Sequence, residues 1–196
     1  MLKAGVLALA LSAAAASVQA APLFDVYQGF CLKTDAEAAS GLAAATAAGW
    51  MPIPNALLQQ MSAGAGIENA QGLMHSSAAG LDFFLVGAKK MPVGPMTLDL
   101  RFCSVGSTGT LGSSTDIATA LASWAGTPPN PVMSKGGLTG YVFLNEDGAH
   151  RPVVAFGDVS TGKAMIQSGH LRFAFFQESS SLQLLAFGVP STTSPN

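Results

Sequence analysis

Ser160 and Lys163 are the residues whose types and spacing point most directly to chemistry. In penicillin-recognising enzymes, an S-x-x-K motif places a serine nucleophile beside a lysine base on one turn of a helix. Gly162, together with the strands that we predict on both sides of it, opposes a helix here. The companion motifs S-D-N and K-T-G do not accompany it. A cell-envelope serine hydrolase that uses Ser160 and Lys163 is therefore the alternative hypothesis and not the leading one.

The same segment also approaches a nucleotide-binding motif. Residues 157–164 match a phosphate-binding loop, GxxxxGK followed by Ser or Thr, except at Ala164, which lacks the hydroxyl that holds magnesium. Such a loop must open a helix, because the N-terminus of the helix attracts phosphate. Residues 164–176 are instead predicted to form a strand. A Gly-rich turn between strands is the favoured interpretation, and we predict no nucleotide and no other cofactor.

The three histidines are His75, His150 and His170. They lie far apart and show no H-E-x-x-H or C-x-x-C ligand spacing, so the sequence predicts no metal site. His150 is expected to be solvated beside a turn, and His170 to be solvent-facing or hydrogen-bonded on a strand. A triad assembled from distant Ser, His and Asp residues stays open, but no G-x-S-x-G elbow supports it.

The two cysteines, Cys31 and Cys103, predict a structural disulfide rather than a reactive thiol, since an exported domain with two thiols usually joins them. The bond would close a loop of about 73 residues and contribute roughly 4 kcal/mol on the chain-entropy estimate. Cys103 ends the segment 96–103, which alternates strictly. Met96, Leu98, Leu100 and Phe102 share one face, so the bond must lie on the other.

The N-terminus has the pattern of a signal peptide. Lys3 is followed by an uncharged apolar run over residues 4–16, which is shorter than the about 20 residues that a membrane span needs. Small residues at Val18 and Ala20 predict cleavage after Ala20, with cleavage after Ala21 as the alternative. We therefore expect a signal peptide over 1–20, a single exported domain over 21–190, and a disordered tail over 191–196.

The composition of the chain excludes some classes of binding partner. Only 10% of residues are charged and the formal net charge is -2. The basic residues are scattered, so the chain lacks the electrostatic footprint of a nucleic-acid-binding protein. No segment after the signal peptide is long and apolar enough to span a membrane. These features leave an unknown protein or small molecule as the partner.

Periodicity and turn residues predict an α+β fold. Thr34 and Glu37 form a capping box that begins a helix ending at Gly49, and a second main helix runs from Thr115 to Gly126. Residues 62–72 are expected to be a loop, and Lys89 and Lys90 to lie in a solvated connection. The remaining predicted elements are a short helix over 56–61 and strands over 73–77, 81–88, 97–104, 138–144, 152–156, 163–177 and 181–189. We therefore expect an antiparallel sheet of about six to seven strands with the two main helices packed on it.

Cys31, the Gly49-Trp50 pair and the strand-end Cys103 carry a resemblance. They resemble a group of small uncharacterised exported bacterial proteins that share a Cys-helix-Gly-Trp opening and a second cysteine at a strand end. The resemblance implies no activity. Because no catalytic constellation is convincing, the leading hypothesis is a non-enzymatic periplasmic or secreted binding or structural module. An assembly subunit that pairs through an exposed sheet edge is a third class.

Overall fold

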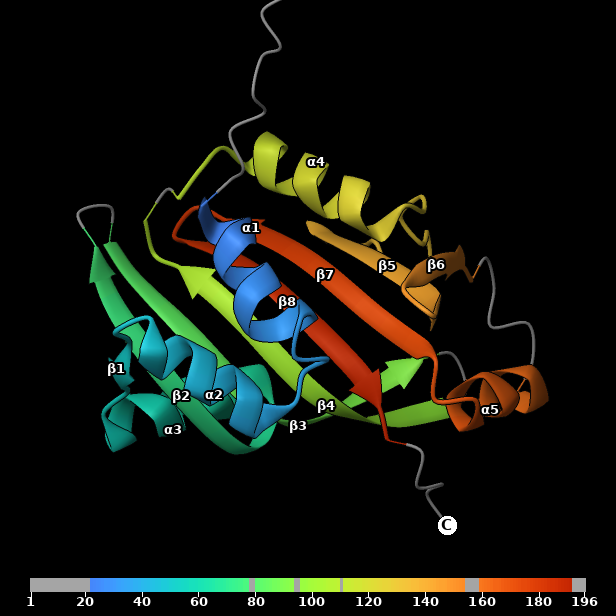
Figure 1. Ribbon diagram of the computed structural model, residues 1–196, viewed down its shortest axis with the longest axis horizontal. Coiled ribbons are helices and arrows are strands. Elements are labelled where there is room, and N and C mark those ends of the chain that lie inside the picture. Colours follow the sequence, from blue (N-terminus) through green and yellow to red (C-terminus); the bar gives the residue numbers. More distant parts are fainter. Residues whose placement is uncertain (1–21, 78–79, 94–95, 110, 154–158, 192–196) are drawn as a thin grey trace, which may run out of the picture.

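A single antiparallel sheet of eight strands organises the chain, in the order β1-β2-β3-β4-β8-β7-β5-β6 (Figure 1). The structure is a computed structural model that describes residues 22–77, 80–93, 96–109, 111–153 and 159–191. The α+β prediction is confirmed. The strands are β1 (Met51–Pro52), β2 (Ile67–Ser77), β3 (Gly80–Val93), β4 (Met96–Ser107), β5 (Leu138–Glu146), β6 (Ala149–Pro152), β7 (Leu171–Ser179) and β8 (Leu182–Pro190).

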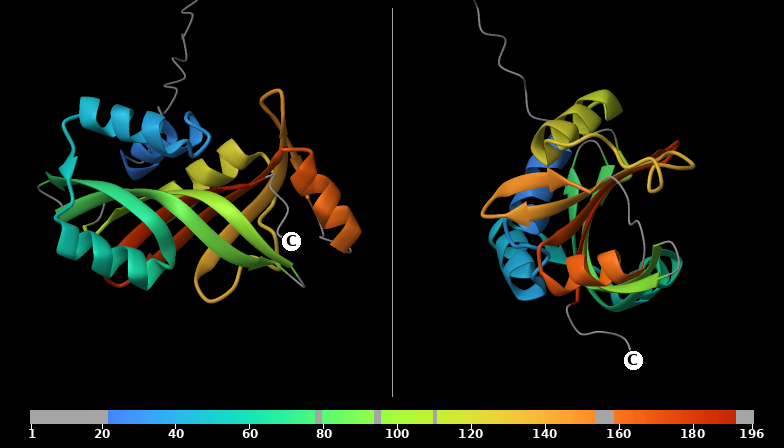
Figure 2. Two further views of the ribbon diagram at one scale, coloured as in Figure 1. Left: turned by 90° about the horizontal axis from the view of Figure 1, so that it is seen from below. Right: turned by 90° about the vertical axis from the view of Figure 1, so that its right-hand side faces the viewer.

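Helices lie on both faces of this sheet (Figure 2). We call the face that carries α1, α2 and α4 the front face, and the face that carries α3 and α5 the back face. The helices are α1 (Pro22–Tyr27), the π-helix η1 (Gln28–Leu32), α2 (Ala38–Ala47), α3 (Asn55–Ala65), α4 (Ser114–Ala125) and α5 (Val159–Gln167). Among the described residues, no helix is long and apolar enough to cross a membrane.

Each face has its own hydrophobic core, as expected for a sheet that is covered on both sides. The front core contains residues of α1, η1 and α4 and every second residue of the central strands. Its largest fully buried side chains include Leu23, Tyr27, Phe84, Ile117, Leu121 and Phe143. The back core uses the alternate residues, including Ile67, Phe83, Leu85, Leu100, Phe102, Phe173 and Phe175.

The disulfide Cys31–Cys103 fastens η1 to β4 in the front core, with a Cα–Cα distance of 5.5 Å. Leu98, Leu100 and Phe102 lie in the back core, so the predicted division of β4 into two faces is confirmed. The bond therefore joins the N-terminal segment to the strand's front side, away from those three residues.

The predicted capping box is wrong in its register. Glu37, not Thr34, is the N-cap of α2, and its carboxylate accepts hydrogen bonds from the backbone N–H groups of Ala39 and Ser40. The Thr34 hydroxyl instead donates to the carbonyl of Phe30 in η1. The helix therefore begins later because the turn after η1 occupies the residues that the box would use.

The region before the first long strand is more regular than the sequence indicated. The short helix expected over 56–61 continues as α3 to Ala65, and β2 begins at Ile67, so the expected loop over 62–72 is wrong. Gly66, at φ +64°, makes the abrupt change between them possible. The strand that the prediction of six to seven omits is β1, whose two residues are too few to show alternation in the sequence.

The expected strand over 163–177 is wrong in its first half. Residues Val159–Gln167 form α5, and β7 begins only at Leu171. Packing decides this segment: Met165 and Ile166 contact the back core from the helix. β5 and β6 form a hairpin around Asp147 and Gly148. The strand expected over 152–156 is placed too late, because β6 covers Ala149–Pro152, and residues 154–156 lie outside the described residues.

Three predicted segments lie wholly or partly outside the described residues. They are the signal peptide over 1–20, the second half of the strand over 152–156, and the tail over 191–196 apart from Ser191. The backbone N–H of Ser191 donates to the carbonyl of Asp99 at 2.7 Å. The sheet ladder therefore continues to the last described residue.

Candidate functional site

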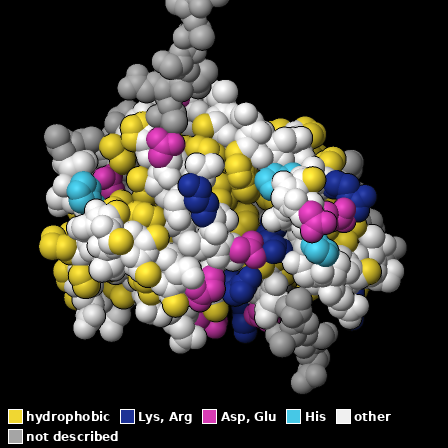
Figure 3. All heavy atoms as spheres, viewed as in Figure 1, with side chains coloured by type: hydrophobic (Ala, Val, Ile, Leu, Met, Phe, Trp, Pro, Cys, Tyr) yellow, Lys and Arg dark blue, Asp and Glu magenta, His cyan; other side chains and the backbone are white. Residues whose placement is uncertain are grey.

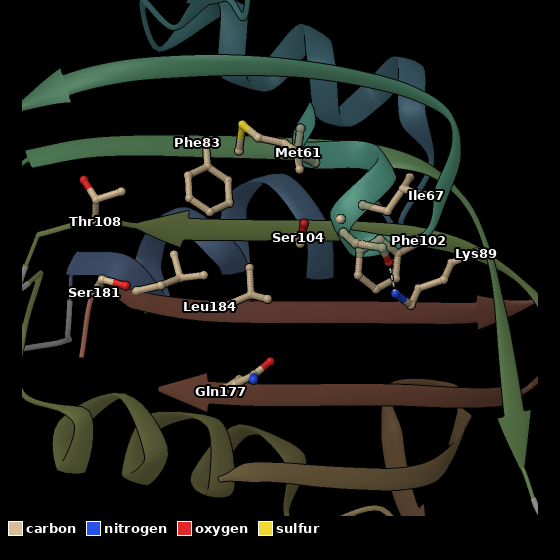
Figure 4. Close-up of a pocket in the computed structure, with 14 residues that line it drawn as sticks. Met61, Ile67, Phe83, Lys89, Phe102, Ser104, Thr108, Gln177, Ser181 and Leu184 are labelled. Carbon is tan, nitrogen blue, oxygen red and sulfur yellow. Dashed lines mark hydrogen bonds between the residues drawn. The ribbon is translucent and has the colours of Figure 1, made fainter. Parts of the chain in front are cut away.

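A groove of about 620 Å³ opens on the back face between α3 and the centre of the sheet (Figure 4). We call it the back-face groove. Its volume lies within the range typical of small-molecule sites, and its walls are mainly apolar. Its described lining residues are Met61, Gly64, Ala65, Ile67, Phe83, Leu85, Lys89, Phe102, Ser104, Thr108, Gln177, Ser181, Leu182 and Leu184.

Small residues on β4 create the hollow. Ser104 lies in the lining, and Gly106 follows it on the same face. A Cβ added at Gly106 would lie 2.2 Å from the ring of Phe83. The ring of Phe83 therefore lies directly over the backbone of β4, where only glycine leaves room for it, and it forms part of the groove wall.

Lys89 carries the only charge among the described lining residues, and it lies at one end of the groove in Figure 4. Its ammonium donates a hydrogen bond to the carbonyl of Ala65, the last residue of α3, and lies 5.3 Å from the ring centroid of Phe102. Burial lowers the pKa of Lys89, because the charged ammonium loses contact with water. The sequence-based expectation of a solvated connection at Lys89 is wrong, since β3 continues through this residue to Val93.

Hydroxyl groups line the end of the back-face groove that lies away from Lys89. Thr108 and Ser181 lie opposite Lys89 in Figure 4, and both also line a second cavity of about 410 Å³ at the β7–β8 turn. In that cavity Gln183 donates from Nε2 to the carbonyl of Gly112 at 3.2 Å, while its buried Oε1 has no hydrogen-bond partner among the described residues. The groove thus runs from a cationic end, through an apolar middle, to an uncharged polar end.

The structure brings Ser160 and Lys163 onto one turn of α5, contrary to the strands that we predicted around them. Both residues are exposed, however. A lysine acts as a general base after burial has removed water from its ammonium group, and exposed Lys163 lacks that environment. The geometry therefore lends the hydrolase hypothesis no support beyond the shared helical turn.

The structure also gives no support to the phosphate-binding loop that residues 157–164 resemble. Its first glycine lies in 154–158, outside the described residues, and Gly162 is already inside α5. In a phosphate-binding loop the residues before the second glycine must curl around the anion as a loop. Here Val159, Ser160 and Thr161 are helical, so the part that the structure describes does not form such a cradle.

A row of polar residues crosses the front face at one end of the sheet, and the sequence did not indicate it. Successive cross-strand pairs join His75 to Asp82, Asp82 to Ser107, Ser107 to Gln183, and Gln183 to Glu178. His75 Nδ1 lies 3.6 Å from Asp82 Oδ2. A histidine beside an aspartate is the combination that supplies the base and the carboxylate of a Ser-His-Asp triad.

The order of this row excludes a triad. A catalytic histidine must lie between the serine and the carboxylate, whereas here Asp82 lies between His75 and Ser107. Strands two apart are separated by about 10 Å, so the imidazole cannot reach the hydroxyl. Ser107 is also fully buried, and its Oγ accepts a hydrogen bond from the backbone of Gly109.

The other histidines have structural contacts. His150 is not simply solvated, as we expected: its ring lies 4.7 Å from that of Trp124 and 4.3 Å from that of Phe143, and its Nδ1 lies 3.1 Å from the carbonyl of Trp124. His170 is exposed and contacts the carbonyl of Asn145 at 2.8 Å. Within the described ranges, His, Cys, Asp and Glu form no group of three that could hold a metal ion.

Charges on the molecular surface are sparse. On the face shown in Figure 3, lysine and arginine side chains lie interspersed with aspartate and glutamate. No broad basic surface is visible there that could track a phosphate backbone.

Sequence reasoning missed the groove because its residues come from six separate elements, α3, β2, β3, β4, β7 and β8. One signal could have suggested part of it: Phe83, Leu85, Gly87 and Lys89 continue a period of two beyond the predicted end of the strand. The aromatic residues of β7 are core residues, with Phe173 fully buried.

The fold is thus an eight-stranded antiparallel α+β sandwich of one sheet between helices, with an amphipathic groove on its back face. Comparison of the chain with protein-family models, with curated proteins and with solved structures gave no match.

Proposed function

We propose that the protein is an exported binding module for a small, elongated, mainly apolar molecule, which it holds in the back-face groove. The observation that carries this proposal is the groove itself: about 620 Å³, walled by apolar side chains from a helix and the central strands, with a few polar groups at its ends. A largely apolar pocket with a few placed polar groups is the usual form of a small-molecule site.

Export is supported by the disulfide. Cys31 and Cys103 are bonded in the front core, and such bonds persist in oxidising compartments. The expected signal peptide agrees with this location. Intact mass of the protein recovered from the periplasm or medium tests it: we expect a chain that starts at Ala21 with no free thiol. If residues 1–20 remain on the chain, or if both thiols are free, export is contradicted.

Binding is tested by titration with the neutral apolar dye N-phenyl-1-naphthylamine, with fluorescence as the readout. Wild type should give saturable binding at one site per chain. Leu184→Trp fills the middle of the groove and should weaken binding at least about tenfold, since a bulky ring occupies the ligand's volume. Val132→Trp introduces the same ring at an exposed position outside the lining, and should bind as wild type does.

Thermal unfolding of both variants checks that each is folded. Absence of saturable dye binding to wild type overturns the proposal, as does equal affinity of wild type and folded Leu184→Trp.

A further inference from the structure

Among the described residues of the elements that flank it, the ammonium of Lys89 has no neighbouring acid on its own face of the sheet. Its cross-strand partners are the apolar residues Ile67 and Leu100. The nearest charged residues of the flanking strands in register, Glu68, Asp99 and Arg101, are paired with the residues next to Lys89 and so point to the opposite face. No residue of α3 is charged. The cation is therefore not balanced by the elements packed around it.

Capping of α3 accounts for only part of this arrangement. A lysine near a helix C-terminus is favourable because it binds free carbonyls, and Lys89 does so at Ala65. An ammonium has three N–H donors, however, and this bond uses one. A lysine that served only as a cap would gain by remaining in water, whereas Lys89 is half-buried in the groove wall against Phe102.

The two ends of the back-face groove differ in chemistry. Along β4 and the residue that follows it, the lining extends from Phe102, beside Lys89, to Thr108 at the hydroxyl end. This distance is about 20 Å at the usual strand rise of about 3.3 Å per residue. The walls between are apolar, with Phe83 and Leu184 in the middle (Figure 4). An occupant that satisfies both the walls and the lysine has a long apolar body and a negative charge at one end.

We propose that the ligand is a single-chain amphiphile with one carboxylate head group, which lies along the back-face groove with its carboxylate on Lys89. The proposal rests on the proposed function and specifies its substrate class. The carboxylate accepts hydrogen bonds from the ammonium donors that Ala65 does not use, and a charge-assisted bond in a partly desolvated site is stronger than a neutral one. The chain displaces water from the apolar walls, which provides most of the affinity.

A head-group series tests the proposal: dodecanoate, 1-dodecanol and dodecylamine share one chain and differ in charge. Each is titrated by displacement of N-phenyl-1-naphthylamine at concentrations below micelle formation. Wild type should bind dodecanoate about tenfold or more tightly than dodecanol, the ratio expected for one charge-assisted hydrogen bond, and dodecylamine most weakly.

Three lysine variants locate the preference. Lys89→Met should lower the affinity for dodecanoate to that for dodecanol and leave dodecanol unchanged. Lys89→Arg keeps a cation and should retain the preference. Lys90→Met is the matched control, since the neighbouring lysine is exposed and points to the other face, and it should behave as wild type.

The outcomes separate the two proposals. If wild type binds dodecanol and dodecanoate equally, or if folded Lys89→Met keeps the preference, the carboxylate inference is wrong while the apolar groove stands. A preference for dodecylamine also overturns the inference. If neither dye nor any of the three amphiphiles binds, both proposals fail. Should Lys89→Met not fold, Lys89→Arg and Lys89→Gln provide the same comparison of charged with neutral.

Discussion

Arg172 on β7 binds both carboxylate oxygens of Asp35, with Nε 2.6 Å from Oδ1 and Nη2 2.8 Å from Oδ2. The two residues are 137 positions apart. Asp35 lies in the turn after η1, and η1 also carries the disulfide to β4. The N-terminal segment is thus attached to both halves of the sheet, covalently to one and by a bidentate ion pair to the other.

Removal of the Asp35 carboxylate should destabilise the protein strongly, because the Arg172 side chain is only 10% exposed and would lose its counter-charge. Asp35→Ala is expected to cost about 3 kcal/mol in the free energy of unfolding, as measured by urea denaturation. Arg101 offers a matched control: it contacts the same carboxylate at 3.5 Å but is 53% exposed. Arg101→Ala should cost less than about 1 kcal/mol. Equal losses in the two variants would show that burial of Arg172 is not what makes the pair important.

Loss of the disulfide should be of similar size. It closes a loop with a sequence separation of 72, so the double variant Cys31→Ala, Cys103→Ala is expected to lose roughly 4 kcal/mol. Urea denaturation measures this directly. Wild type with reductant should approach the same value, which separates the effect of the bond from that of the two substitutions. A loss below about 1 kcal/mol in both experiments contradicts the assigned role.

Tyr27 should make the protein sensitive to alkali. Its hydroxyl donates to the carbonyl of Ala186 at 2.9 Å in the front core, and burial raises its pKa well above 10.0. In the unfolded chain the tyrosine ionises near pH 10, so its contribution to stability is complete below that pH and is lost as pH rises above it.

Urea denaturation of Tyr27→Phe at two pH values checks this. Near pH 8 the variant should be about 1 kcal/mol less stable than wild type, from the lost hydrogen bond. Near pH 11 the difference should shrink or reverse, since phenylalanine does not titrate. A constant difference at both pH values would contradict burial of an ionisable hydroxyl. Lysine titration affects both proteins alike.

Local patterns predicted the features that depend on local geometry. The alternation over 96–103 placed Cys103 opposite Leu100 and Phe102, because the period of a strand is set by its own backbone. The helix over Ser114–Ala125 was also predicted within one residue at each end, because Ser113 caps it and Gly126 ends it at φ +62°. Such end signals act over a few residues.

Features that depend on tertiary packing were not predictable in the same way. Residues 163–167 were expected to begin a strand but form part of α5, where Met165 and Ile166 meet the back core. Neither the groove nor the ion pair of Arg172 with Asp35 could be found from sequence, since each requires the strand order that places β4 beside β8. The sequence offers no way to place β7 beside the turn after η1, and only the fold identifies Asp35 as the partner of Arg172.

Gly106 should matter for ligand binding although no ligand is expected to touch it. A methyl group at this position would lie 2.2 Å from the ring of Phe83, so Gly106→Ala must push the ring toward the groove. We expect at least about tenfold weaker binding of N-phenyl-1-naphthylamine, together with a stability loss of about 1–3 kcal/mol from overpacking. The double variant Gly106→Ala, Phe83→Leu removes the clash and should recover binding. Unchanged binding by a folded Gly106→Ala variant would show that Phe83 does not shape the groove.

Binding of a carboxylate amphiphile should depend on pH through Lys89. Burial lowers the pKa of Lys89 below 10.5, and a bound carboxylate would raise it, because it stabilises the charged ammonium. Linkage then requires that affinity for dodecanoate fall as pH rises through the pKa of the free protein. Between that value and the titration of the carboxylate itself, near about pH 4 to 5, affinity should be constant.

Two comparisons assign this pH dependence to Lys89. Lys89→Arg should hold dodecanoate with little change across the same alkaline range, because a guanidinium does not lose its proton in proteins. The affinity of wild type for 1-dodecanol should also stay constant, since no charge is involved. If Lys89→Arg loses dodecanoate over the same pH interval as wild type, the titrating group lies elsewhere and Lys89 does not hold the head group.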